Sequence, residues 1–177
     1  MLREFGMWLP SPGRVLDIGT GTGHVAEAIG ATGLTIVGCD VVDLRMAVVR
    51  FVLYDGGALP FRSNGFDAVL LVTVLHHVPA AQHNLLLAEA LRVLRVGGRL
   101  VVFEDTYRTG FERSLTAWQD SAMNLEFVGH PHSNRQLTEW RSLLGALGGV
   151  IRHEHEYVVW YGVFRVRHGL LVVERAR

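Results

Sequence analysis

Short apolar runs alternate with segments of helical periodicity along most of the chain. The first run, 14–18, predicts a buried strand, and a glycine cluster then leads into a helical segment over 24–31. Apolar residues recur at helical spacing over about 80–94, where the Gly97-Gly98 pair is predicted to end the helix, and again over 137–147. Further strands are predicted at 34–39, 48–54, 66–74, 99–103, 150–159 and 169–174.

Strands that alternate with helices pair in parallel through right-handed crossovers. The pattern therefore predicts an α/β fold with a doubly wound, Rossmann-like, mostly parallel seven-stranded sheet and an antiparallel C-terminal strand. Ligands of such sheets bind at the carboxyl ends of the strands. Fourteen residues separate Asp40 from Asp55, too few for a full helix and a strand, so we expect a short or irregular crossover there.

The chain has 177 residues, which predicts a single domain over 1–177 with an inserted substrate cap at about 106–134. Hydrophobic residues make up 49% and charged residues 19%, a composition that excludes disorder. A single cysteine, the absence of a membrane-spanning apolar run and the absence of a signal-peptide pattern predict a cytoplasmic protein.

Seventeen basic residues balance seventeen acidic ones, so the chain lacks the positive charge expected of a protein that binds many phosphates. We therefore expect no nucleic-acid partner. All the basic residues are arginine, since the sequence contains no lysine. This excludes Schiff-base chemistry, a lysine general base and the lysine of a phosphate-binding loop.

The glycine cluster at 17–23, Asp-Ile-Gly-Thr-Gly-Thr-Gly, follows a predicted strand and opens a helix, where backbone amides can approach a ligand. Residues 21–26 also match the dinucleotide pattern G-x-G-x-x-A, and Asp40 lies near the spacing of a ribose-binding carboxylate. Nicotinamide and adenosyl cofactors both carry such a ribose. Asp17 distinguishes the two classes, because its carboxylate repels a pyrophosphate and suits an ammonium group.

Five segments in order carry a family resemblance: VLDIGTGTG, IVGCD, DGGALPF, NGFDAVLLVTVLHHV and EALRVLRVGGRLVVFED. With them, the chain resembles the class I S-adenosylmethionine-dependent methyltransferases from about residue 15 to residue 103. The subgroup that it resembles most acts on small molecules and has a Leu-His-His-Val turn after the fourth strand. The resemblance implies S-adenosylmethionine as the cofactor.

The resemblance also implies where the cofactor binds. The glycine cluster and the end of the fourth strand would line its methionine end. Asp40 would bind both ribose hydroxyls, and Asp55 with Gly56 would hold the adenine ring. The predicted cofactor-binding residues are Asp17, Gly19, Thr20, Gly21, Gly23, Asp40, Val41, Asp55, Gly56, Val72 and Thr73.

Methyl transfer from a sulfonium needs mainly positioning, and a general base only where the acceptor must lose a proton. His76 and His77 follow the fourth strand, near the expected point of transfer, and either fits a base, a substrate donor or a structural turn. Glu104 and Asp105 end the fifth strand and point to opposite sides of it. We predict His77 and Asp105 as catalytic residues, with a structural role as the alternative for each.

The predicted cap carries an apolar stripe at helical spacing. The stripe fits a lid helix that packs on the core, or an apolar substrate pocket lined by Trp118. Asn124 and a polar loop that begins at His130 follow along the chain. The stripe consists of Phe111, Leu115, Trp118, Ala122 and Leu125, and the predicted substrate residues are His76, Trp118, Asn124 and His130.

Two histidine pairs, His130-x-His132 and His153-x-His155, have a spacing that puts both rings on one face of a strand. The only cysteine, Cys39, belongs to a different predicted strand. Histidines that alternate in this way usually reflect a solvated strand face, so we predict no metal site.

Together these patterns predict methyl transfer to a small, partly apolar acceptor molecule. One alternative is a nicotinamide-dependent oxidoreductase, which fits the pattern at 21–26, and another is a non-catalytic cofactor-binding member that acts through a partner. About thirteen residues precede the first strand. The lid over the cofactor is therefore minimal, is completed by a second copy in a homodimer, or lies upstream of the given start.

Overall fold

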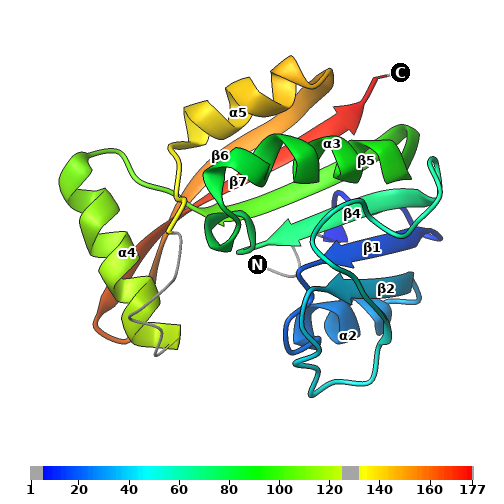
Figure 1. The fold of residues 1–177 in the computed structure, drawn as a ribbon, viewed down its shortest axis with the longest axis horizontal. Coiled ribbons are helices and arrows are strands. Elements are labelled where there is room, and N and C mark those ends of the chain that lie inside the picture. Colours follow the sequence, from blue (N-terminus) through cyan, green and yellow to red (C-terminus); the bar gives the residue numbers. More distant parts are fainter. Residues whose placement is uncertain (1–5, 125–131, 177) are drawn as a thin grey trace.

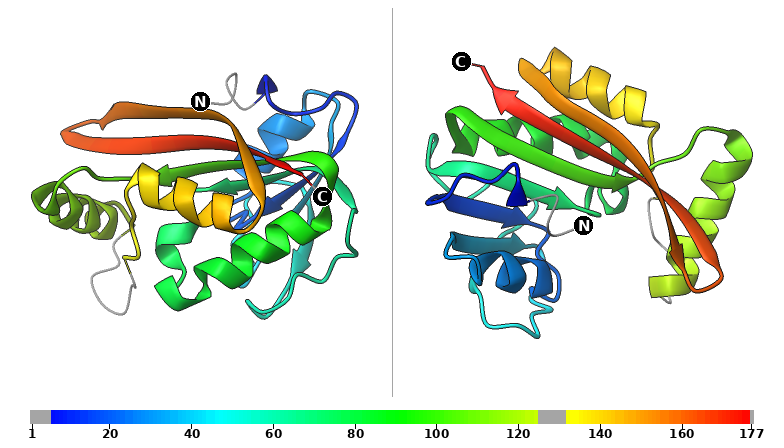
Figure 2. Two further views of the ribbon diagram at one scale, coloured as in Figure 1. Left: turned by 90° about the horizontal axis from the view of Figure 1, so that it is seen from above. Right: turned by 180° about the vertical axis from the view of Figure 1, so that it is seen from behind.

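The computed structural model describes residues 6–124 and 132–176. Within these ranges, seven strands form one sheet with the order β3-β2-β1-β4-β5-β7-β6. Helices α3 and α5 cover one face of the sheet and α2 covers the other (Figure 1, Figure 2). The α/β fold predicted from the sequence is confirmed. No helix in the described ranges is long and apolar enough to cross a bilayer.

Five neighbouring strands of the sheet are parallel, and the sixth strand in the sheet order runs antiparallel to both of its neighbours. The parallel strands are β3 (Arg50–Leu53), β2 (Thr35–Asp40), β1 (Arg14–Ile18), β4 (Phe66–Val72) and β5 (Leu94–Asp105). β7 (Phe164–Arg175) pairs antiparallel with both β5 and β6 (Gly149–Tyr161), which confirms the antiparallel C-terminal strand. The helices are α2 (His24–Gly30), η1 (Leu75–His77), η2 (Ala80–Gln82), α3 (His83–Val93), α4 (Gly110–Asn124) and α5 (Leu137–Ala146).

The central strands are almost wholly apolar because helices cover both of their faces. Successive side chains of β1 point to opposite faces and join different clusters. Val15 packs in the cluster that includes Ile29 of α2, whereas Leu16 packs in the cluster that includes Leu87 of α3 and Trp140 of α5. The core therefore consists of two layers separated by the sheet, which fixes the strand ends along one edge.

The structure shifts some predicted boundaries around β4 and β5. α3 ends at Val93 and β5 begins at Leu94, so the Gly97-Gly98 pair lies inside a strand and does not end the helix. β4 ends at Val72, two residues earlier than predicted, because Thr73 has a φ of 53° and leaves the extended conformation. The first difference lies at the amino end of β5 and the second at the carboxyl end of β4.

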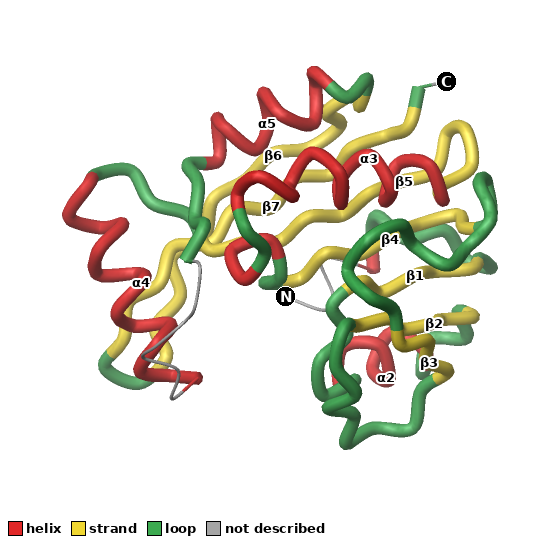
Figure 3. The backbone as a smooth tube through the Cα atoms, viewed as in Figure 1, coloured by secondary structure: helices red, strands yellow, loops and turns green. Residues whose placement is uncertain are grey.

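The crossover between β2 and β3 contains no helix, as the short spacing predicts (Figure 3). β3 is shorter than the predicted 48–54. The two C-terminal strands are longer than predicted, with 13 residues in β6 and 12 in β7. They form a hairpin that extends beyond the parallel strands (Figure 1).

Helix α4 lies against the outer part of this hairpin (Figure 1). An ion pair between Arg167 and Glu112, with 3.1 Å between Nη2 and Oε1, joins β7 to the helix. After α4 the chain returns to the sheet, where the Ser133 amide donates a 2.9 Å hydrogen bond to the His76 carbonyl. The segment on either side of α4 therefore borders the carboxyl ends of β4 and β5.

Candidate functional site

The glycine turn after β1 packs closely against Val74 at Gly19 and is open at Gly21. Gly19, Gly21 and Gly23 have φ values of 70°, 49° and 84°, in the left-handed region that favours glycine. The Gly19 amide donates to the Cys39 carbonyl at 2.8 Å, and a Cβ added to Gly19 would lie 2.4 Å from a methyl carbon of Val74. A Cβ added to Gly21 would meet nothing within 4 Å. A ligand can therefore approach the backbone at Gly21.

Asp17 ends β1 just before this turn, and its side chain is buried. The Thr20 hydroxyl donates a 2.7 Å hydrogen bond to its Oδ2. Burial raises the pKa of Asp17 to about 6, opposed by the hydrogen bond from Thr20 and assisted by the negative charge of Asp40. A cation placed beside this carboxyl group would favour its ionised form, because the positive charge compensates for lost solvation.

Two further acidic residues lie near this turn, at the ends of β2 and β3. Asp40 accepts hydrogen bonds from the Gly21 amide at 2.9 Å and from the Val41 amide at 2.7 Å. Asp55 is exposed and accepts a hydrogen bond from the amide two residues later at 2.9 Å. A Cβ added to Gly56 would lie 3.4 Å from Val41, so the loops after β2 and β3 are adjacent.

Val72 is the last residue of β4, the fourth strand of the predicted cofactor site, and Thr73 follows it. The Thr73 amide donates to the Phe103 carbonyl at 2.7 Å, and its hydroxyl donates to the Val72 carbonyl at the same distance. The predicted cofactor residues are thus gathered at the carboxyl ends of β1, β2, β3 and β4. Their contact with a cofactor stays a prediction.

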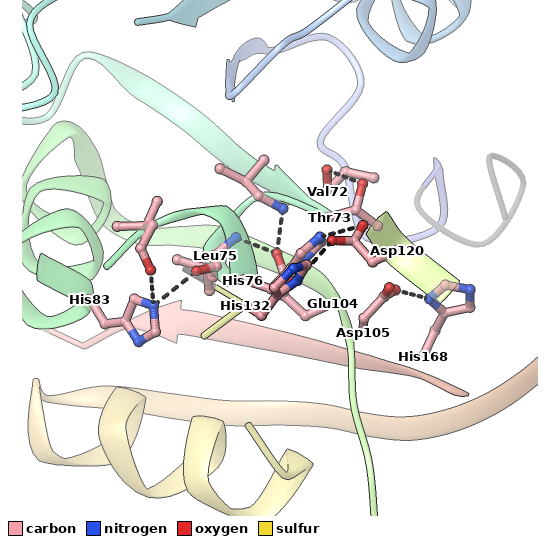
Figure 4. A network of polar contacts seen from close by, with 12 residues as sticks. Val72, Thr73, Leu75, His76, His83, Glu104, Asp105, Asp120, His132 and His168 are labelled. Atoms are coloured by element: carbon pink, nitrogen blue, oxygen red, sulfur yellow. Dashed lines mark hydrogen bonds and ion pairs between the residues drawn. The ribbon is translucent and has the colours of Figure 1, made fainter. Parts of the chain in front are cut away.

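Glu104 organises the turn that follows β4, a role that the sequence did not indicate. Its side chain is buried, and Oε1 accepts hydrogen bonds from the Val74 amide at 2.5 Å and the Leu75 amide at 2.6 Å. Its Oε2 lies 2.7 Å from Nδ1 of His76 (Figure 4). One carboxylate therefore binds three donors of a single turn.

His76 is buried between two carboxylates. Besides Glu104 on one side, Oδ1 of Asp120 lies 3.5 Å from its Nε2 on the other. Burial lowers the pKa of His76, but the charges and hydrogen bonds of Glu104 and Asp120 outweigh this and raise the pKa well above its ordinary value. These contacts fit the structural role that the sequence analysis left open as one alternative for His76. His77 is partly buried, with its ring centroid 4.0 Å from that of His76.

Asp120 and His132 extend this network from outside the parallel strands. The sequence considered His132 only in a metal pair with His130, and it did not indicate Asp120. Oδ2 of Asp120 lies 3.3 Å from Nδ1 of His132 (Figure 4). Nε2 of His132 lies 3.0 Å from the Ser121 hydroxyl. The one available sequence signal is that Asp120 and Ser121 are polar residues within the otherwise amphipathic pattern of α4. Their partners depend on the fold.

Asp105, predicted as catalytic, forms a second group of contacts. Its Oδ1 lies 2.7 Å from Nδ1 of His168 on β7, and the side chains of both residues are buried (Figure 4). Nε2 of His168 lies 3.0 Å from the Tyr161 hydroxyl. Burial and the charge of Asp105 raise the pKa of Tyr161. Strand alternation therefore sends Glu104 and Asp105 into two separate polar networks.

The predicted packing of the apolar stripe on the core is wrong for two of its residues. The side chains of Phe111 and Trp118 are exposed, at 78% and 57%. The buried positions of α4 include Thr116, Gln119 and Asp120, and Asp120 meets a polar group, His76, in the turn after β4. The side chain of Asn124, and all of Leu125 and His130, lie outside the described residues.

Several polar atoms near this region are buried without a hydrogen-bond partner among the described residues. They are Oγ1 of Thr106, Oε1 of Gln119, and both the oxygen and the nitrogen of the Asn134 amide. Buried polar groups in folded proteins are normally satisfied, so unpaired ones indicate a region suited to a polar group of a ligand or to water. Such atoms occur just after β5, on α4 and on the loop before α5.

Comparison with known proteins reveals related sequences. Residues 16–102 match a family model described as a methyltransferase domain. The demethylmenaquinone methyltransferase of Renibacterium salmoninarum is 40% identical over 103 residues, which cover 54% of this chain and 43% of that relative. That of Beutenbergia cavernae is 31% identical over 183 residues, which cover 93% of this chain and 73% of that relative. The chain spans about half the length of several such curated relatives.

A solved structure has the same fold at low sequence identity. It is the 1,6-didemethyltoxoflavin-N1-methyltransferase of Burkholderia thailandensis with bound 1,6-didemethyltoxoflavin and S-adenosylhomocysteine. The TM-score is 0.70 at 18% identity, over 94% of this chain and 72% of that one.

Proposed function

The chain belongs to the class I S-adenosylmethionine-dependent methyltransferases, and on this premise we propose that it transfers a methyl group to a small, partly apolar acceptor. The observation that carries the proposal is the buried Asp17 carboxyl group beside the glycine turn. An ammonium partner would compensate this carboxylate for its lost solvation, whereas a dinucleotide would bring a negative pyrophosphate to the same turn.

The residues at the carboxyl ends of β1 to β4 fit the cofactor of this family. Asp17 would bind the ammonium group of the methionine portion, and the open side of Gly21 would let the cofactor approach the backbone. Asp40 would exchange one of its present amide hydrogen bonds for a ribose hydroxyl. Asp55 and Gly56 would hold the adenine ring. When bound, S-adenosylmethionine supplies the activated methyl group.

The acceptor would bind beyond β4 and β5, under a cap formed by residues 106–134. The unpaired Asn134 amide and the neutral charge of the chain support an acceptor with polar atoms but without several charges. The relatives named demethylmenaquinone methyltransferase support a partly apolar acceptor, so a demethylated quinone is the first compound to test. Trp118 and Asn124 stay candidate contacts in the cap.

We propose that Asp105 and His168 take up the proton of an acceptor. We assign them this role because the carboxylate lies 2.7 Å from one ring nitrogen and leaves the other facing Tyr161. A proton from the acceptor would pass to the Tyr161 oxygen while the phenolic proton moves to Nε2 of His168. His77 is the second candidate base, since His76 has both ring nitrogens beside carboxylates.

The first test is ligand-induced stabilisation of the folded chain. S-adenosylmethionine or S-adenosylhomocysteine at about 100 times its Kd adds about 2.7 kcal/mol to the free energy of unfolding. For a domain of this size the melting temperature would rise by roughly 5–10 °C. A rise with NADH and none with either adenosyl compound would instead support an oxidoreductase. Transfer of a labelled methyl group to a demethylated quinone then tests the acceptor.

A further inference from the structure

A compact group of metal-ligand side chains lies where α4 meets the turn after β4. Within the described residues, one ligand atom each of His76, His77 and Asp120 lie within 4.8 Å of one another. His132 lies beside this group, because its Nδ1 is 3.3 Å from Oδ2, the second oxygen of Asp120. Figure 4 shows His76, Asp120 and His132 directed toward the same point.

We propose that His76, His77, Asp120 and His132 bind a divalent transition-metal ion of the zinc class. These residues come from η1, from α4 and from the loop before α5. The site therefore joins the turn after β4 to the helix that packs on the hairpin. It is separate from the glycine turn, and a metal ion bound there would exclude His77 as a base in the proposed methyl transfer.

The spacing of the ligand atoms supports coordination. Zinc binds histidine nitrogen at about 2.0–2.1 Å in tetrahedral sites, which places neighbouring ligand atoms roughly 3.3 Å apart. Oδ1 of Asp120 lies 3.5 Å from Nε2 of His76, and its Oδ2 lies 3.3 Å from Nδ1 of His132. Both distances exceed the ~2.7–2.9 Å of a hydrogen bond between charged groups, whereas Glu104 lies 2.7 Å from His76, in that range.

The surroundings of the histidines fix which nitrogens can bind. Glu104 accepts a hydrogen bond from Nδ1 of His76 and so leaves Nε2 directed at Asp120. The Ser121 hydroxyl lies 3.0 Å from Nε2 of His132 and leaves Nδ1 directed at the same carboxylate. A carboxylate that orients a ligating histidine in this way is a regular feature of protein metal sites.

Charge and burial favour a cation at this position. Glu104 and Asp120 are buried carboxylates, at 1% and 8% exposure, and His76 is 1% exposed. Two buried carboxylates are costly unless a positive charge lies beside them, and a bound divalent ion supplies that charge when His76 is deprotonated. Imidazole ligands suit zinc and its neighbours, whereas magnesium and calcium take oxygen ligands.

This assignment differs from the sequence prediction of no metal site. The predicted pairs had a two-residue spacing, but the proposed ligands come from three separate segments. The pair on β6 does not join them, since its rings stack on aromatic neighbours: His153 on Trp8 at 4.9 Å and His155 beside Tyr157 at 4.4 Å. His155 therefore provides a matched control.

The test is titration of tag-free, chelator-treated protein with Zn²⁺, Co²⁺ and Mg²⁺ in the absence of S-adenosylmethionine. We expect one equivalent of Zn²⁺ by calorimetry, one equivalent of Co²⁺ with the visible absorption of a tetrahedral ion, and little response to Mg²⁺. Asp120→Asn should weaken Zn²⁺ binding at least tenfold, and Glu104→Gln by about 10–100-fold. His155→Gln should bind as the wild type does.

Three results would overturn the proposal: no Zn²⁺ or Co²⁺ bound by folded protein, binding of Mg²⁺ alone, or unchanged Zn²⁺ affinity in folded Asp120→Asn. Circular dichroism of each variant shows whether it folds. Because Asp120 lies on α4 outside the sheet, we expect Asp120→Asn to fold, so that it can be tested even if Glu104→Gln unfolds. Failure here leaves the methyltransferase proposal intact, since the two experiments share no ligand.

Discussion

Replacing Asp17 by asparagine should stabilise the free protein and weaken its binding of S-adenosylmethionine. The carboxyl group is 2% exposed and has its pKa raised to about 6 from 3.8, first by burial. The folded chain therefore holds this proton more tightly than the unfolded chain. Its contribution to stability is complete below about pH 4 and is lost as the pH rises through about 6.

The magnitude follows from the difference in pKa. About two units at 1.36 kcal/mol each correspond to about 3 kcal/mol at pH 7. Asparagine has no such proton and keeps an oxygen that can accept from the Thr20 hydroxyl. The free variant should therefore melt roughly 6–12 °C higher than the wild type at pH 7, with little difference at pH 4.

Differential scanning calorimetry from pH 4 to pH 8, with and without the cofactor, measures both effects. In the presence of S-adenosylmethionine the order should reverse, because the variant lacks the charge that binds the ammonium group. Asp43→Asn is the control, since this exposed carboxylate lies in the next loop and has its pKa lowered to about 2, first by a hydrogen bond from Arg45. Equal stability of wild type and Asp17→Asn at pH 7, or a difference that persists at pH 4, would refute the reasoning.

Three further changes test other parts of the site. Glu104→Gln should lower the free energy of unfolding by about 3 kcal/mol in urea titrations, because an amide cannot accept from both turn amides and His76 at once; wild-type stability would remove its organising role. Gly19→Ala should cost about 1–3 kcal/mol, since its φ is 70° and a Cβ would approach Val74 to 2.4 Å. Tyr161→Phe should reduce kcat about 100-fold with unchanged cofactor Kd; an unchanged kcat would exclude the proton path.

The cofactor side of the site was predictable because its signals are local. Each acidic residue lies near the carboxyl end of its own strand, and the carboxyl ends of parallel strands meet at one edge of the sheet. Asp17, Asp40 and Asp55 therefore come together without knowledge of any side-chain packing. The fold class was predictable for a related reason. The hydrophobic periodicity of each segment indicates a helix or a strand without reference to the rest of the chain.

The network around Glu104 and His76 was not predictable, because its members are distant in sequence. Glu104 and His76 are separated by 28 positions, and only the pairing of β4 with β5 brings them together. Hydrophobic periodicity also misled for α4, where Trp118 is exposed and Asp120 is buried. A helix that packs against polar strand ends buries polar residues, and the sequence of the helix alone does not show what it packs against.

The turn that Glu104 holds has a consequence for the rate at which ligands bind. Val74, Leu75 and His76 are fixed by one carboxylate before any ligand arrives, so their loss of backbone freedom is a cost of folding. Binding partners then meet a surface whose shape is already set, and association is limited by diffusion and access more than by loop ordering. If the hydrogen bonds of Glu104 were lost, the entropic cost of ordering the turn would arise at each binding event and no longer during folding.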